Sequence, residues 1–72
     1  IDFVMVRRRD EVGAIECKWN QDQFSSDALK VFRSLYNRGN NYLVCPISAP
    51  GYRKRISGME IQVCNPEGLL KS

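Results

Sequence analysis

The sequence predicts a small α/β domain, in which a mixed β-sheet carries one packed helix in the order β-β-α-β-β. Two apolar runs joined by a charged turn predict a hairpin over residues 1–7 and 12–19. An amphipathic segment over 24–37 precedes two more apolar runs, 42–46 and 59–64. A helix between strands is a natural crossover, so we expect the second and third strands to be parallel.

The register of the hairpin follows from its alternation. Matching residues of like character on one face pairs Val6 with Val12, Val4 with Ala14 and Asp2 with Glu16. Lys18 shares the face of Glu16, because residues two apart on a strand point the same way. Ile15, Cys17 and Trp19 lie on the other face, where we expect Trp19 to pack against the helix.

The remaining elements are predicted from spacing and from turn residues. The apolar positions of the helix recur at intervals of three and four, and they are Phe24, Ala28, Val31, Phe32 and Leu35. Gly39 stands just past the helix end, and Asn40-Asn41 form the turn. Residues 47–58 are expected to be a loop with an exposed Tyr52. Residues 65–67 are a turn into a last helical turn at 68–70.

Length and composition limit the function classes. The chain has 72 residues, enough for a single domain over 1–72. Its first strand starts without a lead-in, so we expect it to be a fragment of a longer protein. The net charge of +3 is compatible with a polyanionic partner. The sequence contains no histidine, which excludes histidine-based catalysis and histidine metal ligands.

The three cysteines, Cys17, Cys45 and Cys64, each lie in an apolar run without C-x-x-C spacing. This pattern is typical of buried core thiols in a reducing compartment, so we expect a cytoplasmic protein. No apolar stretch approaches the roughly 20 residues of a membrane span, so no membrane partner is expected.

Asp2, Glu16 and Lys18 form the candidate catalytic constellation. Two carboxylates on one face are hard oxygen ligands for Mg²⁺ or Mn²⁺, with Asp2 and Glu16 as the metal ligands. A lysine one pleat along can orient water or stabilise charge that develops on a phosphate. These are the parts of metal-dependent phosphodiester hydrolysis. The alternative is a solvent-exposed ion pair between Glu16 and Lys18, worth ~0–1 kcal/mol.

Ile1-Asp2-Phe3-Val4 followed by Ile15-Glu16-Cys17-Lys18-Trp19 resembles the core of PD-(D/E)XK nucleases. Nearly the whole chain also resembles the C-terminal domain of prokaryotic AAA-type ATPases of the DUF4143 family. The further matching segments are the helix near Phe24–Leu35, Tyr42-Leu43-Val44, and Val63-Cys64-Asn65-Pro66 through Leu69. The helix and strand that normally precede the aspartate of the nuclease core have no counterpart in these residues.

This resemblance implies part of a restriction-endonuclease-like core, with Asp2 and Glu16 as metal ligands and Lys18 as the catalytic lysine. It implies a nuclease-like domain of an ATP-dependent protein, with Mg²⁺ or Mn²⁺ as cofactor and nucleic acid as substrate. ATP would bind upstream, because the chain contains no G-x-x-x-x-G-K-[ST] motif. The alternatives are an inactive module that docks on its own ATPase domain, or a homo-oligomer formed through an unpaired sheet edge.

Two basic clusters are weaker candidates for contact with nucleic acid. Arg53, Lys54 and Arg55 lie in the predicted loop, and Arg7, Arg8 and Arg9 lie at the hairpin turn. Such clusters can bind a phosphate backbone without reading sequence. The alternative is that both are simply solvated. Gln21 and Gln23 follow the lysine strand, where some nucleases of this class place a helper amide.

Overall fold

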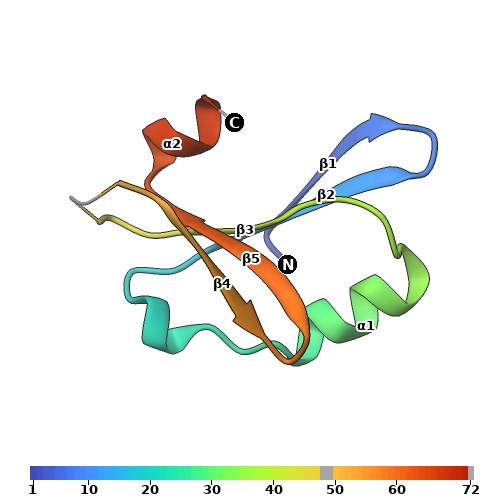
Figure 1. Ribbon diagram of the computed structural model, residues 1–72, viewed down its shortest axis with the longest axis horizontal. Coiled ribbons are helices and arrows are strands. Elements are labelled where there is room, and N and C mark those ends of the chain that lie inside the picture. Colours follow the sequence, from blue (N-terminus) through green and yellow to red (C-terminus); the bar gives the residue numbers. More distant parts are fainter. Residues whose placement is uncertain (48–49, 72) are drawn as a thin grey trace.

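The computed structural model describes residues 1–47 and 50–71. A five-stranded sheet lies between a helix on one face and a shorter helix on the other (Figure 1). The strands are β1 (Phe3–Arg8), β2 (Glu11–Cys17), β3 (Asn41–Val44), β4 (Tyr52–Ile56) and β5 (Met59–Cys64). The helices are α1 (Asp27–Leu35) and α2 (Pro66–Leu70), and a single 3₁₀ turn, η1, covers Gln21–Gln23.

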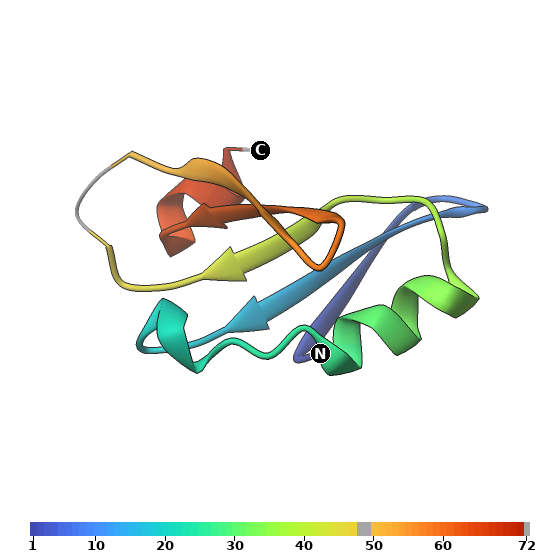
Figure 2. The same ribbon diagram turned by 60° about the horizontal axis from the view of Figure 1, so that its bottom comes forward.

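The sheet is mixed, as the sequence predicts, with the strand order β1-β2-β3-β5-β4. β1 and β2 are antiparallel, and the register pairs Val6 with Val12 and Val4 with Ala14, which confirms the predicted alignment. β2, β3 and β5 are mutually parallel, and β4 returns antiparallel to β5. The carboxyl ends of β2, β3 and β5 therefore meet at one edge of the sheet (Figure 2).

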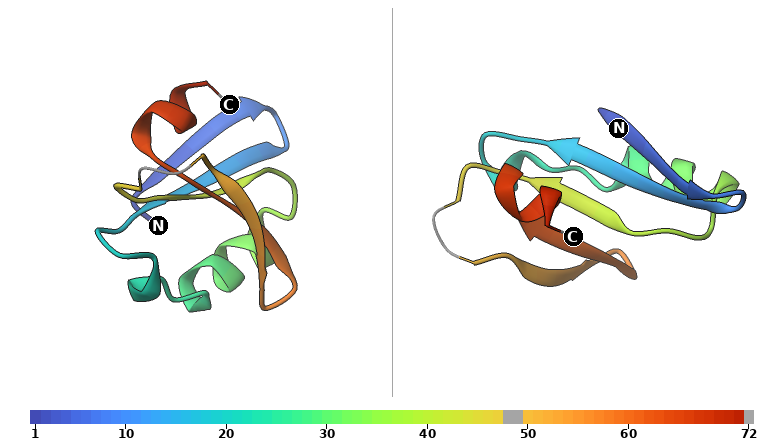
Figure 3. Two further views of the ribbon diagram at one scale, coloured as in Figure 1. Left: turned by 60° about the vertical axis from the view of Figure 1, so that its left-hand side comes forward. Right: turned by 90° about the horizontal axis from the view of Figure 1, so that it is seen from above.

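The core consists of two layers, one on each face of the sheet. On the α1 face the buried residues are Ala14, Leu29, Leu43, Cys45, Ile61 and Val63. On the α2 face they are Ile15, Tyr42, Val44 and Cys64, with Leu69 packed against them. All four residues of β3 are buried, because this central strand has a layer on each side (Figure 3).

The helix is shorter than the sequence predicts and presents a different stripe to the sheet. A capping box formed by Asn20 and Gln23 encloses η1, and Phe24 is extended, so α1 begins only at Asp27. Leu29 is buried and Phe32 packs beside it, whereas Val31 and Leu35 are exposed. The predicted stripe was therefore wrong at Ala28, Val31 and Leu35, which are all exposed.

The Arg33 guanidinium fixes the end of α1. Its Nε donates to Asn41 Oδ1 at 2.7 Å, and its terminal nitrogens donate to the carbonyls of Tyr36, Arg38 and Asn40 at 2.9 to 3.1 Å. The backbone between α1 and β3 is therefore held by hydrogen bonds to a single side chain. Asn41 is buried at the start of β3 rather than in a turn, and its amide donates to the Glu60 carbonyl.

The predicted loop over 47–58 was wrong, because it contains β4 and the turn of a hairpin. Ser57 and Gly58 both have positive φ, 52° and 80°, which is the backbone of a two-residue hairpin turn. The alternation of apolar and polar residues does not predict β4, because the centre of this strand is Arg53-Lys54-Arg55. The residues Ser48 and Ala49 of that predicted loop lie outside the described part of the chain.

The structure also reverses the expected assignment of faces on β2. The face of Ala14 and Glu16 is the one that α1 covers, while Ile15 packs in the α2 layer. Trp19 was predicted to pack against the helix, and that prediction was wrong, since the residue is 86% exposed. Cys17 is exposed as well, whereas Cys45 and Cys64 are buried as expected.

Candidate functional site

Glu16 is the centre of the candidate site. It lies near the carboxyl end of β2, on the α1 face, and only 9% of its surface is exposed. A buried carboxylate is costly unless cations or donors compensate it. One side-chain cation does so here, because Lys18 Nζ lies 4.0 Å from Oε2, and the backbone nitrogen of Ile1 lies 2.9 Å from Oε1. The predicted solvent-exposed ion pair is therefore wrong in its burial, because the carboxylate is enclosed.

Asp2 is held beside β2 by its own backbone and side chain. Its N–H donates to the Ile15 carbonyl at 3.1 Å, and its Oδ2 accepts from the Cys17 N–H at 2.7 Å. The register of the hairpin, extended by one residue, places Asp2 opposite Glu16. The aspartate thus sits at the predicted place on the ribbon, with one oxygen engaged by the neighbouring strand.

Both carboxylates act on the Cys17 thiol. Partial burial raises the pKa of Cys17, and the negative charges of Asp2 and Glu16 raise this pKa further. One sulfur therefore experiences the field of both acidic groups. The strand register and the bond from the Cys17 N–H to Asp2 Oδ2 place the two carboxylates around the same end of β2, which is what a shared cation site requires.

The donor set fits a hard divalent cation. Asp2 and Glu16 offer carboxylate oxygens, and Glu16 holds its carboxylate in a poorly solvated position with Lys18 nearby. No group of three or more potential metal-ligating side chains occurs among residues 1–47 and 50–71. A cation held here would accordingly take the rest of its oxygen ligands from water and from a substrate phosphate, as Mg²⁺ commonly does.

A pocket of about 350 Å³ opens at the carboxyl ends of β2 and β3, next to the candidate site. Its lining residues are Cys17, Lys18, Trp19, Val44, Cys45, Pro46 and Pro66. In open α/β sheets ligands bind outside the carboxyl ends of parallel strands. Sequence reasoning missed Trp19 as a functional candidate, although its position just before the Asn20 cap indicates that the strand has already ended.

The basic residues of β4 lie away from this site. Two strands, β3 and β5, separate β4 from β2. Arg53 Nε lies 3.7 Å from Glu60 Oε1, and Arg55 donates to the Gly58 carbonyl, so both of these cations have local partners. Lys54 is opposite Ile61, on the other face of the strand. The structure therefore does not bring Arg53, Lys54 and Arg55 together with Asp2, Glu16 and Lys18.

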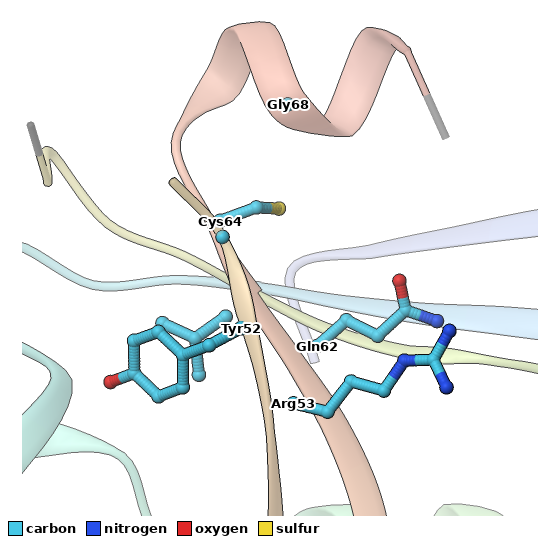
Figure 4. Close-up of a pocket in the computed structure, with 7 residues that line it drawn as sticks. Tyr52, Arg53, Gln62, Cys64 and Gly68 are labelled. Atoms are coloured by element: carbon cyan, nitrogen blue, oxygen red, sulfur yellow. The ribbon is translucent and has the colours of Figure 1, made fainter. Parts of the chain in front are cut away.

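A second pocket of about 260 Å³ lies between β4, β5 and α2. Figure 4 shows the Arg53 and Gln62 side chains next to each other, with Tyr52 pointing to the opposite side of β4. The Tyr52 hydroxyl donates to Gln21 Oε1 of η1. Gln23 Oε1 accepts from the Asn20 N–H, so both glutamines predicted as helper amides have structural partners.

Comparison with family models, curated proteins and solved structures finds no significant match to this chain. Within the described residues, no helix combines the length and the apolar composition needed to cross a membrane.

Proposed function

We propose that this chain is a nuclease-like domain that hydrolyses phosphodiester bonds of nucleic acid with the help of Mg²⁺ or Mn²⁺. The observation that carries the proposal is the buried Glu16 carboxylate, which has Lys18 Nζ 4.0 Å away and Asp2 beside it, immediately before the adjacent strand β1. Asp2 and Glu16 would hold the cation. A cation bound there would polarise the phosphate and would lower the pKa of water.

Lys18 would orient the attacking water or stabilise the charge that develops on the phosphate. Its ammonium lies 4.0 Å from Glu16 Oε2, the residue also lines the pocket at the end of β2, and about a third of its side chain is exposed. From there it can donate to a phosphate oxygen on which negative charge develops, or orient the attacking water. The resemblance to ATPase-linked nuclease domains supports action within an ATP-dependent protein, with ATP bound outside these residues.

Cleavage assays test this proposal. The chain is incubated with single- and double-stranded DNA and with RNA in Mn²⁺, and parallel samples contain EDTA. We expect cleavage in Mn²⁺ only, and we expect Lys18→Ala and Glu16→Gln to lower the rate by about 100-fold or more. Lys30→Ala is the matched control, because Lys30 is an exposed lysine of α1.

The result that would contradict hydrolysis is a folded chain that binds Mn²⁺ and cleaves none of these substrates. Equal activity of Lys18→Ala and Lys30→Ala would remove the role of Lys18. Cleavage that persists in EDTA would remove the role of the cation.

A second candidate function, that of an interaction module, is favoured by the edge strand β1. In the described part of the chain no strand pairs with its outer side. Phe3, Val4 and Val6 are 52 to 68% exposed, and Val31 and Leu35 of α1 are exposed on the same side as the two valines. An apolar edge of this kind can pair with an ATPase domain or with a second copy. A chain that is inert towards nucleic acid would favour this function.

A further inference from the structure

The indole of Trp19 is unused by the fold. The residue is 86% exposed, and within residues 1–47 and 50–71 its ring makes no aromatic contact and no hydrogen bond. It is the only tryptophan in the sequence. An exposed indole is unusual in so small a domain, because burial of the same ring would add much apolar contact area to the core and stabilise the fold.

The surface beside the ring is a concave apolar pocket. Val44, Cys45, Pro46 and Pro66 supply it with aliphatic and sulfur-containing walls, and the volume is about 350 Å³. An apolar floor next to an exposed indole suits a flat heteroaromatic ring, which gains stacking as well as burial. A nucleobase has this shape, and every base offers a π-face.

The charge beside the pocket favours a ligand that joins a ring to an anion. Lys18 lines the same pocket and reaches towards Glu16, so one side chain connects the stacking surface to the candidate hydrolytic centre. A phosphate on Lys18 and its attached base on Trp19 would belong to the same nucleotide or to adjacent ones. Duplex DNA buries the faces of its bases within the stack, so this arrangement requires an unpaired strand.

The same edge of the sheet continues towards β4. Tyr52 and Arg53 begin that strand beside the carboxyl end of β5, and the Tyr52–Gln21 hydrogen bond ties them to η1. Three strand spacings, roughly 14 Å, separate β2 from β4, which is within the span of a few nucleotides. Arg53 is largely exposed and available to a backbone phosphate, at the expense of its long ion pair with Glu60.

From these observations we infer that the Trp19 pocket binds a base of single-stranded nucleic acid, with the adjoining phosphate on Lys18. This inference rests on the proposed function, because it names the substrate class of the same site. It adds a substrate-binding role for Trp19, because Asp2, Glu16 and Lys18 have no ring that could stack on a base.

The intrinsic fluorescence of Trp19 reports directly on such stacking. The chain is titrated in EDTA with an oligothymidylate and, separately, with an abasic oligonucleotide of equal length and equal phosphate number. We expect the thymidylate to quench the emission in a saturable manner, and the abasic backbone to quench it weakly and bind at least fivefold less tightly. Equal quenching and equal affinity would show contact with the backbone alone and would overturn the inference.

Variants separate stacking from folding. With a labelled oligothymidylate, Trp19→Ala should weaken binding by roughly 5- to 100-fold, whereas Trp19→Phe should retain most of the affinity. Leu35→Ala, which truncates another highly exposed apolar side chain, should change affinity by less than about twofold. Circular dichroism checks that all three remain folded. An affinity of Trp19→Ala equal to that of the parent chain would overturn the inference.

The two proposals fail differently. Quenching in EDTA without any cleavage in Mn²⁺ would support binding of single strands in the Trp19 pocket and would contradict the proposed hydrolysis. Cleavage in Mn²⁺, with an unchanged emission spectrum and with full activity of the Trp19→Ala variant, would support the proposed hydrolysis and overturn the role of the Trp19 pocket. Preference for a duplex over the single strand in the binding assay would also overturn the inference.

Discussion

At the scale of single residues, the site is organised by the burial of one carboxylate. Glu16 is enclosed on the α1 face, and the Lys18 ammonium lies 4.0 Å from its Oε2. On the solvated face of a hairpin, water would stabilise such a carboxylate and no neighbouring cation would be needed. Enclosure strengthens its attraction for cations, because less water competes for the charge. Because of this enclosure, replacement of Glu16 should weaken cation binding more than replacement of Asp2.

The Cys17 thiol provides a residue-scale test of the arrangement of the acids. Because partial burial, Asp2 and Glu16 all raise its pKa, less thiolate is present at a given pH and alkylation should be slow. Asp2→Asn removes one negative charge, so the pKa should fall and labelling by iodoacetamide at pH 8 should accelerate. Mass spectrometry of the Cys17 peptide across a pH series measures the midpoint.

Asp10→Asn is the control for this experiment. Asp10 pairs with Arg38 at 2.6 Å at the far end of the hairpin, so its charge should not reach Cys17. Cys45 and Cys64 are buried and should remain unlabelled in the native protein. A midpoint that is the same in Asp2→Asn and in the parent chain would contradict the placement of Asp2 beside the end of β2.

At the scale of elements, the segment between α1 and β3 fixes how the helix is placed on the sheet. Gly39 has a φ of 135°, a conformation that side-chain-bearing residues rarely adopt. An added Cβ there would collide with the backbone of Val12, which donates to the Arg38 carbonyl at 2.9 Å. The close approach lets this loop bond to β2 and aligns β3 next to it.

Gly39→Ala should therefore destabilise the protein by about 3 kcal/mol or more, since both the backbone conformation and the space are lost. Gly58→Ala is the matched comparison, because Gly58 also has positive φ but faces open space. It should cost only about 1 kcal/mol. Urea unfolding followed by circular dichroism measures both. Equal losses would contradict the close contact between Gly39 and β2.

The elements also show what the sequence could and could not predict. Alternation along 1–19 was sufficient for the hairpin and for its register, because a one-residue slip would turn every side chain over. It was insufficient for the face under the helix, since both faces of β2 carry apolar residues. That choice depends on the side of the sheet along which the crossover passes, which is decided by the order of all strands.

The missed strand has a local explanation. Ser57-Gly58 between Ile56 and Met59 is a hairpin signal of two residues, and it marks β4 despite its basic centre. Charged residues on an edge strand discourage pairing with other molecules, which gives Arg53, Lys54 and Arg55 a structural explanation. The exposure of Trp19 depends on β2 ending at Cys17 rather than at residue 19, and the cap residue Asn20 directly after Trp19 is the sequence signal for that early end.

At the scale of the whole molecule, the parallel strands direct their carboxyl ends to one edge, and the candidate chemistry gathers there. Glu16, Lys18 and Trp19 follow one another at the end of β2, while Asp2 arrives from β1. The opposite end of the hairpin carries Arg9 and the Asp10–Arg38 ion pair and contributes nothing to the site.

Titration calorimetry with Mn²⁺ shows whether Asp2 and Glu16 together bind a divalent cation, on which the proposed hydrolysis depends. We expect one Mn²⁺ per chain, with binding weakened by about tenfold or more in both Asp2→Asn and Glu16→Gln. Lys18→Ala should bind Mn²⁺ at least as tightly as the parent chain, because this change removes a cation that competes for Glu16. Absence of Mn²⁺ binding to the folded chain, or affinities that do not change in the two carboxylate variants, would contradict the account.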